Sequence, residues 1–136
     1  MACKLFTFLA VATLVTQGYG AVIEEIRLDD EEVNHISNPL IGRGISIPHS
    51  ILDTLEACSV SFPNGMSFDV YPNNNLPSSV SAGNSVFPSC GINFRNPSVS
   101  LSGTYELTAL TRHFDNRRTL QYKRFIINFT ESELFQ

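Results

Sequence analysis

The chain has 136 residues, of which 43% are hydrophobic and 16% are charged, and its formal net charge is −4. This length allows one ordinary domain and excludes two. A mean hydropathy of +0.02 excludes both a protein with several membrane spans and a disordered chain. The mild acidity excludes a globally basic nucleic-acid binder.

Residues 1–20 have the pattern of a secretory signal peptide. Lys4 precedes an uncharged apolar run at 5–15, and small residues, Gly18 and Gly20, occupy the −3 and −1 positions for cleavage before Ala21. The alternative is an uncleaved membrane anchor, but a spanning helix needs about 20 apolar residues and this run is shorter. We therefore expect a secreted, extracellular protein that does not insert into a membrane.

Residues 21–42 form an acidic leader. Within it, residues 22–32 contain six acidic residues against Arg27, whereas residues 33–136 contain seven acidic and seven basic residues. A block of like charges is usually solvated, which predicts a flexible leader. The alternatives are a short helical turn and a tail that folds back onto a basic surface.

Residues 43–130 are predicted to form one all-β domain. Short runs of alternating apolar and polar residues are separated there by clusters of Gly, Pro, Asn and Ser. In chain order, the predicted strands are 56–62 and 66–71, joined by the turn Pro63-Asn64-Gly65, then a short edge strand at 79–81, a run at 90–95, and a closing hairpin of 104–112 and 120–130. The tail, 131–136, carries no strong pattern.

Alternation along these strands also selects a core. In a strand, successive side chains point to opposite faces, so the apolar residues of each run share one face. Enough apolar surface gathers in this way for two packed sheets. The predicted core residues are Val60, Phe62, Phe68, Val70, Ile92, Phe94, Tyr105, Leu107, Phe125, Ile127 and Phe129.

Two cysteines remain once the signal peptide, with Cys3, is removed. In an oxidising compartment, Cys58 and Cys90 indicate one disulfide. The alternative is a metal site, but two further ligands at suitable spacing are missing, and we expect neither a metal nor a cofactor. Closing this loop is worth roughly 3–4 kcal/mol of unfolding free energy in the chain-entropy model.

The runs Cys90-Gly91-Ile92 and Ser102-Gly103-Thr104-Tyr105 resemble those of immunoglobulin-like domains, in particular secreted modules of arthropods. The family pattern is Asp-x-Gly-x-Tyr-x-Cys; here Gly103 and Tyr105 match, Leu101 and Leu107 replace the Asp and the Cys, and the chain has no tryptophan. The resemblance implies an antiparallel two-sheet sandwich in which the Tyr105 hydroxyl bonds to backbone near the start of its strand. It also implies binding rather than catalysis. A secreted β-sandwich of another topology is the alternative.

The closing hairpin carries the candidate binding surface. Residues 112–124 hold five of the eight basic residues of the mature chain, together with an aromatic side chain. Arginines beside an aromatic residue are typical of binding hot spots. We expect an extracellular protein or an anionic glycan as partner; the alternative is a solvated hairpin neutralised by Glu106 or by the leader. The candidate residues are Arg112, His113, Phe114, Arg117, Arg118, Lys123 and Arg124.

Catalytic patterns are weak in this chain. His49 and Ser50 are adjacent and Asp53 follows, but no Gly-x-Ser-x-Gly motif surrounds a serine. A small secreted hydrolase is expected only if a pocket gathers His49 or His113 with carboxylates.

The function that the sequence favours is a secreted, single-domain, non-enzymatic binding protein. The alternative is a structural matrix or gland protein that self-associates.

Asn128-Phe129-Thr130 is an N-glycosylation acceptor motif, and alternation places Asn128 on the face opposite Phe129. We therefore expect a glycan at Asn128 to be exposed.

Overall fold

The computed structural model describes residues 23–37, 43–83, 89–95 and 98–131. The predicted signal peptide and the tail beyond Glu131 lie outside these ranges. Within them the chain is built from strands and one 3-10 turn, Val99–Leu101. The strands are β2 (Ile23–Arg27), β3 (Glu31–Ser37), β4 (Arg43–Ile47), β5 (Thr54–Ser61), β6 (Ser67–Tyr71), β7 (Val80–Ala82), β8 (Cys90–Phe94), β9 (Gly103–Arg112) and β10 (Arg118–Glu131).

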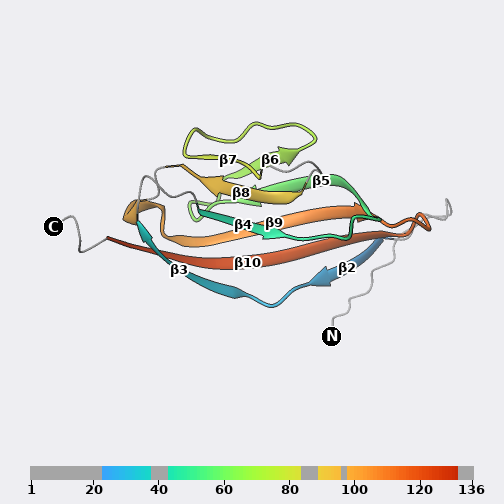
Figure 1. Ribbon diagram of the computed structural model, residues 1–136, viewed down its shortest axis with the longest axis horizontal. Helices are drawn as coiled ribbons and strands as arrows, with labels where there is room; N and C mark the ends of the chain where they lie inside the picture. Colours follow the sequence, from blue (N-terminus) through green and yellow to red (C-terminus); the bar gives the residue numbers. More distant parts are fainter. Residues whose placement is uncertain (1–22, 38–42, 84–88, 96–97, 132–136) are drawn as a thin grey trace.

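The strands form two sheets that pack face to face. The larger sheet has the order β2-β10-β9-β5-β6, with β3 also paired to β10, and the smaller has the order β4-β8-β7 (Figure 1). Pairing is antiparallel in both sheets, apart from β2 and β3, which run parallel to β10. The predicted antiparallel sandwich is confirmed. So are the hairpin of β5 and β6, the short edge strand β7 and the closing hairpin of β9 and β10.

The core lies between the sheets and contains the residues that alternation selects. Nine of the eleven predicted core side chains are buried, and the other two, Phe62 and Phe68, pack against them. Aromatic rings meet edge to face across this core, with centroids 5.1 Å apart for Phe62 and Tyr105 and 5.3 Å apart for Phe94 and Phe129. Edge-to-face contact adds to the free energy of area burial. The predicted disulfide is present and joins Cys58 on β5 to Cys90 on β8, one from each sheet.

The start of β9 has the local geometry that its sequence motif implies. Gly103 has φ of 144°, and a Cβ there would lie 2.6 Å from the Pro63 Cγ atom, so only glycine fits. Two residues later, the Tyr105 hydroxyl donates a hydrogen bond to the Leu101 carbonyl over 2.6 Å. This bond ties the 3-10 turn to the strand, as the resemblance implies.

The prediction of a flexible leader is wrong for residues 23–37. These residues form β2 and β3, which pair with β10 from Arg118 to Glu131 (Figure 1). Their acidic side chains meet cations of β10: Glu31 lies 2.8 Å from the Lys123 ammonium, and Asp30 lies 3.2 Å from the Arg124 guanidinium. The segment is therefore a strand pair held by backbone bonds and opposite charge, which corresponds to the alternative of a tail folded onto a basic surface.

Candidate functional site

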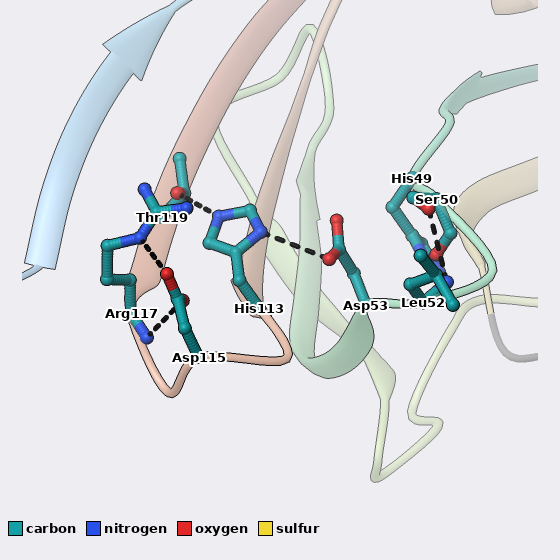
Figure 2. A network of polar contacts seen from close by, with 8 residues as sticks. All are labelled: His49, Ser50, Leu52, Asp53, His113, Asp115, Arg117 and Thr119. Atoms are coloured by element: carbon teal, nitrogen blue, oxygen red, sulfur yellow. Dashed lines mark hydrogen bonds and ion pairs between the residues drawn. The ribbon is translucent and has the colours of Figure 1, made fainter.

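The candidate site lies at one end of the sandwich, where the β9–β10 turn meets the β4–β5 loop (Figure 2). The turn is closed by the His113 amide, which donates to the Arg117 carbonyl over 2.7 Å, and Asn116 has the left-handed φ of 70°. Asn tolerates this conformation better than most residues. In the β4–β5 loop, the Ser50 hydroxyl accepts a hydrogen bond from the Leu52 amide over 3.1 Å. Both loops are thus internally bonded.

The His113 ring joins the two loops. Its Nδ1 atom lies 3.1 Å from the Asp53 carboxylate of the β4–β5 loop, and its Nε2 atom lies 2.6 Å from the Thr119 hydroxyl of β10 (Figure 2). Because Nδ1 faces a carboxylate, the neutral ring donates there and Nε2 accepts from Thr119. The ring is partly buried and Thr119 is buried. His113 therefore positions one loop against the other.

The cations at this end are paired with acids. Glu56 lies between two arginines, 3.2 Å from the Arg112 Nε atom and 2.8 Å from the Arg118 Nε atom. Arg117 forms a contact of 2.7 Å with Asp115, and this hydrogen bond lowers the pKa of the Asp115 carboxyl. The three arginines of this end are thus matched in number by the carboxylates of Asp53, Glu56 and Asp115, so the loop end is close to neutral.

Three large apolar side chains protrude from the same two loops. Phe114 is 80% exposed in the β9–β10 turn, and Ile51 and Leu52 are 71% and 70% exposed in the β4–β5 loop. We call Ile51, Leu52 and Phe114 the apolar tip. The loops that carry it are held together because Asp53, next to Leu52, contacts His113, next to Phe114.

The candidate binding residues predicted from the sequence lie in two separate regions of the structure. Arg112, His113, Phe114, Arg117 and Arg118 lie at the loop end, whereas Lys123 and Arg124 lie farther along β10, bound to β3 and the β2–β3 connection. Sequence reasoning missed Ile51 and Leu52. The one feature of the sequence that could have indicated them is that two apolar residues stand side by side between Pro48 and Asp53, outside any alternating run.

The hydrolase interpretation has a partial geometric counterpart. His113 does contact the carboxylate of Asp53 and the hydroxyl of Thr119, an Asp-His-Thr arrangement. Thr119, however, is only 5% exposed, so a substrate cannot reach its oxygen. Cavities of about 290 and 420 Å³ lie elsewhere, on β5, β6, β9 and β10, and between β3, β4 and β10. His49 bonds through Nδ1 to the Ser50 carbonyl oxygen and lies apart from this group.

Asn128 is exposed on β10 while Phe129 is buried, as the alternation predicts. Its Nδ2 atom, the atom that a glycan would occupy, donates to the Asn34 Oδ1 atom over 3.4 Å. None of the described residues forms a helix long and apolar enough to cross a membrane.

Comparison with known proteins identifies the fold. No family model and no curated protein sequence matches the chain. Among solved structures, it is similar to the Ig1 domain of mouse SynCAM 2, with a TM-score of 0.52, 9% identity, and coverage of 76% of this chain and 93% of that one. It is also similar to murine CRIg, with a TM-score of 0.53, 7% identity, and coverage of 73% of this chain and 92% of that one.

The sheet order assigns the strands of the immunoglobulin sandwich. The sheet β4-β8-β7 corresponds to strands B, E and D, and β10-β9-β5-β6 corresponds to strands G, F, C and C′. The disulfide departs from the usual bridge between strands B and F, because it joins strand C to strand E. Cys58 thus occupies the strand that usually carries the core tryptophan, and Leu107 fills the usual cysteine position on β9. The chain has an immunoglobulin-like fold with its inter-sheet bridge moved to another pair of strands.

Proposed function

We propose that the chain is a secreted, single-domain recognition protein, without enzymatic activity, that binds an extracellular protein through the apolar tip. The observation that carries the proposal is the exposure of Ile51, Leu52 and Phe114 on two loops that His113 joins. Exposed apolar side chains on a rigid support are typical of binding sites, because the support lowers the entropy lost on association.

A protein partner is favoured over an anionic glycan. Binding to a sulfated glycan draws on unpaired cations, and each arginine of the loop end already contacts a carboxylate. An apolar side chain, in contrast, gains free energy when it enters an apolar pocket of a partner. We therefore expect the affinity to depend only weakly on salt concentration.

The test is an alanine substitution in the tip. The chain, with its signal peptide removed, is screened against a panel of extracellular proteins, and the hit is titrated with Phe114→Ala. A hot spot of this kind contributes about 2 kcal/mol or more, so the affinity should fall by about thirtyfold. Met66→Ala is the matched control, because Met66 is 55% exposed at the β5–β6 turn. Equal loss with both variants, or none with Phe114→Ala, would contradict the assignment.

We also propose that Asn128 carries an N-linked glycan. The side chain is exposed and lies in an acceptor motif, which supports attachment in a secretory pathway. Expression in a glycosylating host should give a protein whose mass drops on enzymatic deglycosylation. Asn128→Gln should abolish that drop, while Asn34→Gln, at its hydrogen-bond partner, should leave it unchanged.

A further inference from the structure

The open edge of β4 differs from the other sheet edges. Among the described strands, β4 pairs with β8 alone, and its only charged residue is Arg43, at its first position. The other edges have features that oppose pairing with another chain: β3 is acidic at Glu31 and Glu32, β6 carries Asp69, and β7 has three residues. Charges and short length are the usual means by which proteins block such edges.

A groove runs beside this edge. Its volume is about 420 Å³, within the ~300–1,000 Å³ range of ligand sites. One wall is the β4 backbone, and the other comes from β3 and β10. Ile45 and Phe125 are buried and Val33 is partly buried, so its apolar side chains come from both sheets. The lining residues are Glu31, Val33, Gly44, Ile45, Ser46, Pro48, Lys123 and Phe125.

The two charged side chains of the groove form an ion pair with each other. The Lys123 ammonium lies 2.8 Å from the Glu31 carboxylate and 5.1 Å from the centroid of the Phe125 ring. The ring face attracts the cation, which holds it against the wall. A ligand therefore meets an apolar groove of zero net charge beside an open strand edge.

A single extended chain fits this arrangement. A strand edge offers backbone donors and acceptors, and an added strand turns every second side chain to the same face. A second copy docked through its own β4 would not fill the groove, because Ile45 and Ile47 of that strand already lie in its own core. We propose that the β4 edge and its groove bind an extended, uncharged peptide segment of a partner protein by strand addition, with apolar side chains in the groove.

The experiment selects peptides on the folded chain. A phage-displayed library of linear decapeptides is panned against the chain without its signal peptide, and enriched peptides are synthesised and titrated. Val33→Phe should weaken their binding by about tenfold or more, because the added ring occupies the groove. The matched control is Ile126→Phe on the outer face of β10, where Ile126 is 39% exposed. Bound peptide should also slow hydrogen exchange of the amides of residues 44–46.

Several outcomes would overturn the proposal. They are the absence of enriched peptides, equal binding by Val33→Phe, and unchanged exchange at residues 44–46. If Val33→Phe does not fold, hydrogen exchange at residues 44–46 of the parent chain, with and without peptide, decides alone. The apolar tip is not involved, so Phe114→Ala should bind these peptides normally.

Discussion

At the residue scale, Tyr105 combines packing with a hydrogen bond. Its side chain is 1% exposed, two aromatic rings contact it edge to face, and its hydroxyl donates to the Leu101 carbonyl. We expect Tyr105→Phe to lower the free energy of unfolding by about 1–2 kcal/mol, because the carbonyl loses its donor. Urea denaturation measures the difference.

The control is Tyr122→Phe, which removes only a hydroxyl that lies 3.4 Å from an exposed Glu25 oxygen. That variant should retain the stability of the parent within about 0.5 kcal/mol. A loss with Tyr105→Phe that is no larger than the loss with this control would show that the turn bond contributes little.

The same hydroxyl makes stability depend on alkaline pH. Burial raises the pKa of Tyr105 to about 12, while an unfolded tyrosine titrates near its model value of 10.0. The unfolded chain thus releases this proton first, so the stabilisation is complete below pH 10 and declines as the pH rises towards 12. In Tyr105→Phe, this part of the decline should disappear from a series of urea curves.

His113 shows, at the same scale, what a sequence pattern leaves out. The sequence places it in a basic turn, and the structure pairs it with Asp53, which lies 60 positions earlier. Arg112 and Arg118 likewise share Glu56. A local count of charge sees the cations, but Asp53 and Glu56, which contact His113, Arg112 and Arg118, lie far away in the sequence. The sequence therefore predicted where charge gathers, and it could not predict that the loop end is nearly neutral.

At the scale of elements, alternation was sufficient where a strand buries one face. β9 and β10 show it best, because their inward residues Leu107, Phe125 and Ile127 are buried and their outward neighbours, apart from Ile126, are polar. β2 and β3 lack that signal, since none of their described side chains is buried. They form because β10 offers a long edge and two cations. These lie about 90 residues farther along the chain, so the local sequence of β2 and β3 does not reveal them.

Because two cations of β10 help to hold the leader, the stability of its pairing with β10 should depend on their charge. Exposed ion pairs contribute about 0–1 kcal/mol each, so Lys123→Gln with Arg124→Gln should speed amide exchange in β2 and β3 by several fold. Exchange in β9 should stay unchanged. Hydrogen-exchange mass spectrometry resolves the two regions.

Arg117→Gln is the matched control, because its partner Asp115 lies within the same turn. It also removes one positive charge, so a general charge effect would appear in both variants. Equal acceleration by the control, or none by the double variant, would mean that backbone pairing alone holds the segment.

At the scale of the whole molecule, the disulfide joins the two sheets within the buried core. Both sulfurs belong to buried residues, and the bridge spans 32 positions of the chain. Replacing both cysteines, as Cys58→Ala with Cys90→Ala, should cost about 2–5 kcal/mol. Thermal unfolding with and without reductant measures this: the parent should lose stability with reductant, whereas the variant should not respond to it.

The pairing of the terminal strands has a mechanical consequence. β2 and β3 run parallel to β10, with Ile23 opposite Arg118 and Ser37 opposite Glu131. Tension applied outward through Ile23 and Glu131 would pull β2 and β3 in one direction along their length and β10 in the opposite direction. The ladder bonds would then be loaded together, as in shear, rather than opened one at a time. The acidic strands would therefore act as a clamp under force, although they bury little and their ion pairs are weak at rest.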